Sequence, residues 1–220
     1  FGNFLPSSST SGFSTCIFCT IQMINTLRTS AGSHERLMIL EVFGRYAGFT
    51  AMLPTMAGAA NRCVIPEYEF EIEKLAQLMV EDRNSNPSKY SIVLVSEGAM
   101  FKGGEMIFSG MEKDAYGHAK LGGIGDLVSD QLKELSPKFN HGKTINTITQ
   151  KLGYMVRGGD PDALDSIVPM AYGNLALDLI LKGVHGRIVV LKNGRYDNVP
   201  IDVVTSSKKI VKVSEHYNTD

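Results

Sequence analysis

Residues Arg36–Gly48, which read RLMILEVFGRYAG, combine a buried strand with a sharp turn. The first half is an apolar run rich in Leu and Ile, as in a strand covered on both faces of a parallel sheet. The run ends at Phe43, Gly44 and Arg45, and helix-forming residues begin at Thr50. Open α/β folds bind ligands at the carboxyl ends of their strands. The pattern therefore predicts that the Arg45 guanidinium meets a phosphate or carboxylate, unless Arg45 is a solvated loop residue and the glycines only shape the turn.

Strands and helices alternate after this stretch. The spacing of apolar residues predicts helices over Thr50–Ala60 and Phe70–Glu81, and strands over Asn61–Pro66 and Tyr90–Ser96. Alternation over roughly 60 residues indicates βαβ units with right-handed crossovers. The predicted fold class is α/β, with a Rossmann-like open, mostly parallel sheet and flanking helices.

The segments around this centre are predicted in the same way. Phe13–Arg28 has a helical apolar stripe and a cap at Ser14 or Thr15, and residues 29–35 are expected to form a loop. Residues 99–121 are expected to be irregular. The glycines before Asp126 are expected to form a simple turn, although the helix start that follows could hold an anion.

The C-terminal third is expected to begin with a strand inside Lys143–Met155. A helix follows from an N-cap at Asp160 to about Lys182, with a kink or break at Pro169. A hairpin then turns at Asn193-Gly194, and Ile210 with Val211 could add an edge strand.

The composition excludes several function classes. The chain has 220 residues, a formal net charge of −1 and 20% charged residues, which favours neither nucleic acid nor an anionic membrane as a partner. No apolar run approaches the roughly 20 residues of a transmembrane helix, and no signal peptide is expected. Three cysteines, with Cys16 and Cys19 on one helix, do not make a disulfide framework. A cytoplasmic location is expected.

Polar groups follow three predicted strands. Arg45 follows the first, Glu97 follows the second, and Tyr154 to Arg157 follow the third. Two arginines can hold a phosphate bidentately, while a carboxylate accepts hydrogen bonds from sugar hydroxyls. The set suits a sugar phosphate, or else forms a structural ion pair.

These motifs, in this order, resemble the phosphofructokinase family. The resemblance rests on Glu41–Gly48, on Ser96-Glu97-Gly98 and on Leu152–Pro161, and similarity extends from about Ser11 to Val204. It implies phosphoryl transfer to the 1-hydroxyl of fructose 6-phosphate, giving fructose 1,6-bisphosphate, with ATP or pyrophosphate as donor and Mg²⁺ as cofactor. It also implies a homo-oligomer with shared active sites.

The resemblance assigns roles to individual residues. Phe43, Gly44 and Arg45 resemble the loop at the sugar phosphate, where Arg45 also stabilises transition-state charge. Glu97 resembles the carboxylate that binds sugar hydroxyls. The pair that holds the 6-phosphate corresponds to Tyr154 and Arg157, and the arginine that reaches a neighbouring subunit's site corresponds to Arg36.

The sequence also departs from the family pattern. Phe43 stands in place of Met, Ile148 in place of a further arginine, and Tyr154 where many bacterial members have His. The family's donor loop and catalytic aspartate would precede Gly12, so no general base is nominated in this chain.

Three regions are predicted on this basis. Residues 1–156 form a fructose 6-phosphate-binding lobe with an N-terminal loop. Residues 157–185 form crossover helices that pack on the donor lobe, and residues 186–220 form a hairpin and tail. The alternatives are a non-catalytic sugar-phosphate-binding or regulatory module, and an unrelated Rossmann-like domain.

Overall fold

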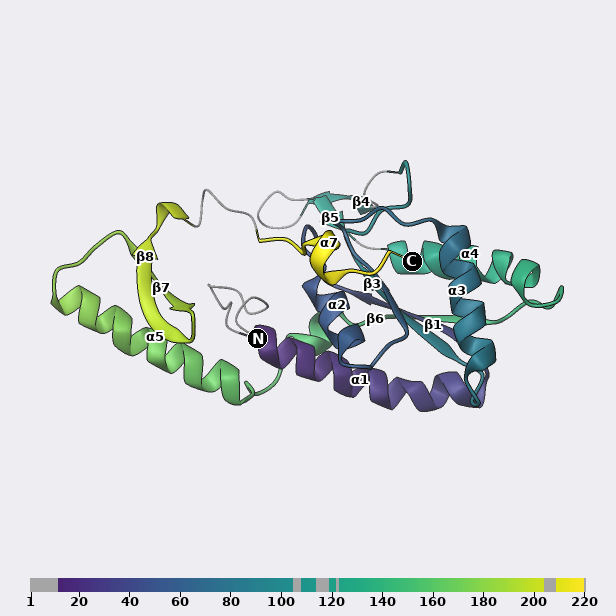
Figure 1. The fold of residues 1–220 in the computed structure, drawn as a ribbon, viewed down its shortest axis with the longest axis horizontal. Helices are drawn as coiled ribbons and strands as arrows, with labels where there is room; N and C mark the ends of the chain where they lie inside the picture. The colour runs from purple at the N-terminus through teal and green to yellow at the C-terminus, as the bar shows by residue number, and fades with distance from the viewer. Residues whose placement is uncertain (1–11, 105–107, 114–118, 122, 204–208, 220) are drawn as a thin grey trace. The chain divides into compact units, whose positions relative to one another are not determined.

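Strand β1 (Leu37–Val42) lies inside a four-stranded sheet, as its apolar sequence predicts. The computed structural model describes residues 12–104, 108–113, 119–121, 123–203 and 209–219 (Figure 1). The strand order is β2-β3-β1-β6, where β2 is Arg62–Val64, β3 is Ser91–Ser96 and β6 is Thr147–Lys151. Every pairing is parallel, so all four strands present their carboxyl ends at one edge. The predicted α/β fold with a Rossmann-like parallel sheet is confirmed.

Helices cover both faces of this sheet. On one face, α3 (Ile72–Ser85) and α4 (Ile124–Phe139) pack against alternate residues of β1 and β3, including Leu37, Ile39, Val93 and Val95. The intervening residues of both strands are also buried and point to the other face. Helix α2 (Phe49–Met56) lies on that face. The connection from β1 to β2 runs across the sheet in the opposite direction to the connection from β2 to β3. Because both crossovers are right-handed, their helices lie on opposite faces. Each fully buried Leu or Ile contributes about 1.5–3 kcal/mol, so the core holds the strand ends in place.

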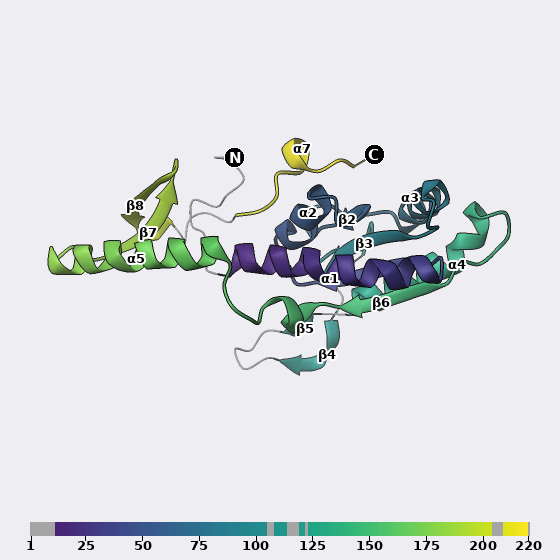
Figure 2. The same cartoon turned by 90° about the horizontal axis from the view of Figure 1, so that it is seen from below.

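Internal contacts divide the chain into two compact units. The first comprises residues 1–18 and 157–209, and the second comprises residues 19–156 and 210–220. The second unit contains the parallel sheet. The first contains α5 (Ala163–Leu181) and the antiparallel hairpin of β7 (Arg187–Lys192) and β8 (Arg195–Pro200) (Figure 2). The hairpin prediction is confirmed, whereas the three regions expected from the sequence stay a prediction.

Helix α1 (Phe13–Ser33) is longer than the sequence predicts, because the segment expected as a loop continues the helix and buries Ala31. Its N-terminus is capped from another part of the first unit. The Asp165 carboxylate accepts hydrogen bonds from the backbone N–H groups of Gly12 (2.9 Å) and Thr15 (2.7 Å) and from the Thr15 hydroxyl (2.6 Å). The expected caps at Ser14 or Thr15 are therefore replaced by a carboxylate that the helix sequence does not contain.

Helix α5 starts later than predicted and continues through its proline. Its N-cap is Asp162 rather than Asp160, since the Asp162 side chain accepts a hydrogen bond from the Asp165 N–H at 2.9 Å. Pro169 lies inside one uninterrupted helix, so the predicted break is wrong.

Two other predictions are wrong. Part of the stretch expected to be irregular forms an antiparallel pair, β4 (Phe108–Lys113) with β5 (Ala119–Leu121). The C-terminal tail contains a short helix, α7 (Val213–His216), and no strand at Ile210 or Val211 within the described residues. The Val211 N–H instead donates to the side chain of Glu67 at 2.7 Å.

Helix α5 also corrects the expectation about apolar runs. The helix has 19 residues and a mean hydropathy of 1.3, so it is long and apolar enough to cross a membrane. Only 11% of its apolar stretch is buried. One such helix is weak evidence for a membrane span, because the core helix of a soluble protein passes the same test. Large apolar side chains are nevertheless exposed along it, among them Leu164, Met170, Ile180 and Leu181.

Candidate functional site

The loop Gly44–Gly48 carries Arg45 from the carboxyl end of β1 to the start of α2. The neighbouring strand end holds it. Glu97 N–H donates to the carbonyl of Val42 (2.9 Å), and Gly98 N–H donates to the carbonyl of Gly44 (3.2 Å). In return, the Gly44 N–H points at a Glu97 carboxylate oxygen 3.4 Å away. The ends of β1 and β3 therefore bring the predicted residues Gly44, Arg45 and Glu97 together.

Two glycines allow this close approach. Gly44 has φ +148°, in the region that favours glycine, and a Cβ there would lie 2.9 Å from the carbonyl oxygen of Ala47. At Gly98, a Cβ would lie 2.0 Å from the carbonyl oxygen of Arg45. The Arg45 backbone is therefore in direct contact with Gly98. The sequence motif indicates a close contact at this glycine but does not show which residue makes it.

Phe43 and Ser96 lie next to the loop that carries Arg45. The Thr50 hydroxyl donates to the carbonyl of Phe43, which ties the strand end to the first turn of α2. The Ser96 hydroxyl is buried and has no hydrogen-bond partner among the described residues, and it would lie 3.3 Å from a Cβ at Gly44. Sequence reasoning missed Ser96, because a small polar residue at the end of a buried strand carries no distinctive pattern.

The third strand end supplies Tyr154. Strand β6 pairs with β1 in parallel, and the Leu152 N–H donates to the carbonyl of Glu41 at 2.9 Å. A 3-10 turn, η1 (Gly153–Val156), follows and leaves the Tyr154 side chain 87% exposed. Tyr154 is therefore presented at the same edge of the sheet as Arg45 and Glu97. Arg157 is exposed and begins the other compact unit, so its role stays a prediction.

Arg36 lies at the opposite edge of the sheet. It immediately precedes β1, and its carbonyl accepts a hydrogen bond from the Ser91 N–H at the start of β3. Its partly buried side chain leaves Nε without a hydrogen-bond partner among the described residues. The structure therefore separates Arg36 from Arg45 by the length of β1, so within one chain the two do not form one site.

The glycine-rich turn before Asp126 binds a carboxylate of the same chain. The carboxylate of Glu41, only 7% exposed on β1, accepts hydrogen bonds from the N–H groups of Gly123 (3.1 Å) and Gly125 (2.9 Å) at the start of α4. The sequence left open whether this helix start holds an anion. The anion is a side chain of the sheet itself, so this turn has a structural role.

The described residues do not bring a metal site together. They contain no group of three or more His, Cys, Asp and Glu side chains that could hold an ion. The described residues therefore offer no ligand set for the Mg²⁺ that the resemblance implies.

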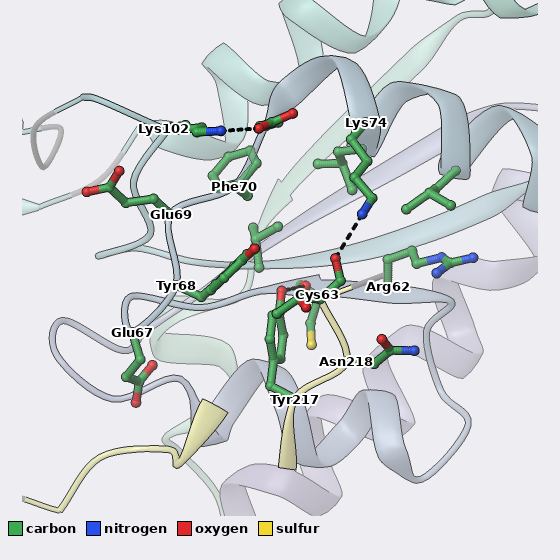
Figure 3. Close-up of a pocket in the computed structure, with 15 residues that line it drawn as sticks. Arg62, Cys63, Glu67, Tyr68, Glu69, Phe70, Lys74, Lys102, Tyr217 and Asn218 are labelled. Atoms are coloured by element: carbon green, nitrogen blue, oxygen red, sulfur yellow. Dashed lines mark hydrogen bonds and ion pairs between the residues drawn. The ribbon is translucent and has the colours of Figure 1, made fainter. Parts of the chain in front are cut away.

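A pocket of about 500 Å³ lies away from the predicted site, between the segment that follows β2, the start of α3 and the C-terminal tail (Figure 3). The side chains of Tyr68, Phe70 and Tyr217 line it together with Lys74 and Lys102. None of the predicted site residues is among its lining residues.

The strand-end arrangement can bind an anion beside a polyol. The arginine supplies a fixed fork of donors for phosphate oxygens, and the neighbouring carboxylate accepts hydrogen bonds from hydroxyl groups.

Comparisons with known proteins identify relatives of this chain. A family model described as Phosphofructokinase matches residues 3–180. The chain is 34% identical over 202 residues to a pyrophosphate–fructose 6-phosphate 1-phosphotransferase of Amycolatopsis methanolica, covering 92% of this chain and 57% of that protein. It is 35% identical over 192 residues to an ATP-dependent 6-phosphofructokinase of Chloroflexus aggregans, covering 87% of this chain and 50% of that protein. The chain thus spans about half the length of these relatives.

Solved structures show the same fold. Phosphofructokinase from Saccharomyces cerevisiae superposes with a TM-score of 0.72 at 21% identity, over 90% of this chain and 24% of that one. A pyrophosphate-dependent phosphofructokinase from Marinobacter aquaeolei gives a TM-score of 0.66 at 20% identity, over 94% of this chain and 50% of that one. Since the family model covers most of the sequence and the fold agrees, the chain belongs to the phosphofructokinase family.

Proposed function

We propose that this chain supplies the fructose 6-phosphate site of a 6-phosphofructokinase, which transfers a phosphoryl group to the 1-hydroxyl and gives fructose 1,6-bisphosphate. The observation that carries the proposal is the Arg45 loop resting on Gly98 beside Glu97, at the carboxyl edge of the sheet. Family membership makes a sugar phosphate the ligand that best fits an arginine next to a carboxylate.

Each site residue has a role that suits its chemistry. Arg45 binds phosphate oxygens and stabilises the negative charge that develops in the transition state, since phosphoryl transfer depends mainly on positioning and charge stabilisation. Glu97 accepts hydrogen bonds from sugar hydroxyls, and Tyr154 with Arg157 holds the 6-phosphate. Arg36 lies at the far edge of the sheet, which suits a role at a neighbouring subunit's site in a homo-oligomer.

The donor is ATP or pyrophosphate, because relatives of both kinds match this chain with similar identity. The general base and the ligands of Mg²⁺ belong to parts of the enzyme other than the residues discussed above. The enzyme is expected in the cytoplasm, where phosphorylated sugars of glycolysis occur.

The test is calorimetric titration of fructose 6-phosphate into the full-length protein and its Arg45→Ala variant, with glucose as the ligand control. A lost charge-assisted phosphate contact is worth about 1.5–3 kcal/mol, so we expect Kd to rise roughly 10- to 150-fold. Arg45→Lys should recover only part of this loss, because lysine keeps the charge without the bidentate fork.

Arg83→Ala is the matched control. Arg83 also makes a side-chain contact, to Glu35 at 3.3 Å, but it lies at the end of α3 away from the strand-end site. Unchanged affinity in Arg45→Ala would contradict the proposal. Intact binding without fructose 1,6-bisphosphate formation from either donor would point to the non-catalytic module.

A further inference from the structure

Glu67 connects the Arg45 loop to the C-terminal segment of the chain. Its carboxylate accepts the Gly48 N–H through both oxygens, at 3.1 and 3.0 Å, and the Val211 N–H through Oε1, at 2.7 Å. Gly48 ends the Arg45 loop and precedes the first residue of α2. Gly48 and Val211, which are far apart in the sequence, therefore donate hydrogen bonds to the same carboxylate.

The loop is built to fit this carboxylate. A Cβ at Gly48 would lie 2.4 Å from Ile65 and 3.0 Å from Oε2 of Glu67, so no larger residue fits without displacing one of them. The partial positive charge at the start of α2 also favours a carboxylate at this position. Glu67 thus fixes the C-terminal end of the Arg45 loop, while Gly98 supports its middle.

The C-terminal segment, residues 210–219, is docked by several contacts in the same unit (Figure 3). Val211 is only 1% exposed, and the Tyr217 hydroxyl donates to the carbonyl of Cys63 at 2.7 Å. The rings of Tyr217 and Tyr68 lie 5.8 Å apart, and the Lys74 ammonium donates to the carbonyl of Thr219 at 3.0 Å. Burial raises the pKa of the Tyr217 hydroxyl well above its usual range, so the hydroxyl remains a donor even in alkaline solution.

We propose that Glu67 is a positioning residue for Arg45, and that docking of residues 210–219 sets the position of Glu67 and thereby the affinity for the sugar phosphate. If residues 210–219 undocked, the Glu67 carboxylate would lose its shortest hydrogen bond, from the Val211 N–H. Its side chain could then turn away from Gly48. The catalytic consequence rests on the function proposed above, whereas the mechanical link rests on the hydrogen bonds alone.

The experiment compares Glu67→Ala, Glu67→Gln and Glu69→Ala in the full-length protein. Glu69 is the matched control, since it lies two residues away, lines the same pocket and also accepts a backbone N–H, from Gly103 at 3.0 Å. Two quantities are measured: the Kd for fructose 6-phosphate, and hydrogen exchange at the amides of Gly48 and Val211.

For Glu67→Ala we expect Kd to rise about tenfold and both amides to exchange at least about tenfold faster, since each loses a charged acceptor. Glu67→Gln should recover much of the affinity, because its single oxygen can replace Oε1, which bonds both amides. Glu69→Ala should match the parent protein in both measurements.

A deletion after Lys209 tests the role of the segment separately. We expect faster exchange at Gly48, and Tyr217→Phe, which removes only one hydroxyl, should act in the same direction more weakly. Unchanged Gly48 exchange in both variants would overturn the link. Faster exchange with unchanged Kd would overturn the positioning role. If the parent protein does not bind fructose 6-phosphate, the proposed function fails, and the exchange data alone decide the link.

Discussion

Replacing Gly98 with alanine should displace the Arg45 loop while leaving the sheet folded. The new Cβ would stand 2.0 Å from the carbonyl oxygen of Arg45, 2.7 Å from its carbonyl carbon and 3.0 Å from its Cα. Gly98 does not have a positive φ, so alanine is excluded there by this clash and not by backbone conformation. All three neighbours are backbone atoms, which cannot turn away as a flexible side chain could.

The size of the effect follows from the distances. Non-bonded heavy atoms rest about 3.5 Å apart, so the loop or the strand end must move by about 1.5 Å. Overpacking of this kind costs about 1–3 kcal/mol of stability, which corresponds to a fall in Tm of roughly 2–12 °C for a chain of this size. A misplacement of about 1 Å in a binding group can lower activity about a hundredfold, so kcat/KM should fall far more than stability suggests.

The assay combines thermal unfolding, titration of fructose 6-phosphate and measurement of kcat/KM in the full-length protein. Gly173→Ala is the matched control, because Gly173 lies inside α5 and a Cβ there meets nothing within 4 Å. It should leave affinity unchanged. If Gly98→Ala bound fructose 6-phosphate as tightly as the parent protein with the same Tm, the contact between Gly98 and Arg45 would not position the loop.

Four further predictions follow from the described contacts. Asp165→Asn should destabilise the start of α1 by about 1–3 kcal/mol, measured by denaturant unfolding, as a charged acceptor is lost. Burial raises the pKa of Asp165, but its hydrogen bonds from Thr15 and Gly12 outweigh this and hold the pKa below its usual value. Its contribution is therefore complete above the unfolded pKa and disappears as pH falls through the folded pKa; the same loss with acid in the Asn variant would contradict this. Glu41→Ala should destabilise the start of α4 by about 1–3 kcal/mol, seen as faster local hydrogen exchange, since the N–H groups of Gly123 and Gly125 lose their acceptor. Burial raises the pKa of Cys63 to about 11, so iodoacetamide at pH 8 should modify it much more slowly in the folded protein than in denaturant. Because α5 exposes large apolar side chains, the 220-residue chain alone should dimerise or aggregate, and a monodisperse monomer in light scattering would contradict this.

The strands could be predicted because their signal is local. Leu37–Val42 and Ser91–Ser96 are continuous apolar runs, and both are completely buried. Glycines at the strand ends marked the loop that carries Arg45, and the order of the motifs indicated the family. Helix ends were less predictable, since Ala31, which is completely buried, belongs to the segment that the sequence pattern assigns to a loop.

The sequence by itself therefore determined the fold class, the family and the strand ends at which Arg45, Glu97 and Tyr154 stand. Only the tertiary structure decided which side chains accept hydrogen bonds from the N–H groups at two helix starts and in the C-terminal segment. Glu41 meets Gly123 across 82 positions, Asp165 meets Thr15 across 150, and Glu67 meets Val211 across 144. A buried or helix-terminal N–H must find an acceptor, but any nearby carboxylate can satisfy it, and a local pattern does not say which one the fold brings close.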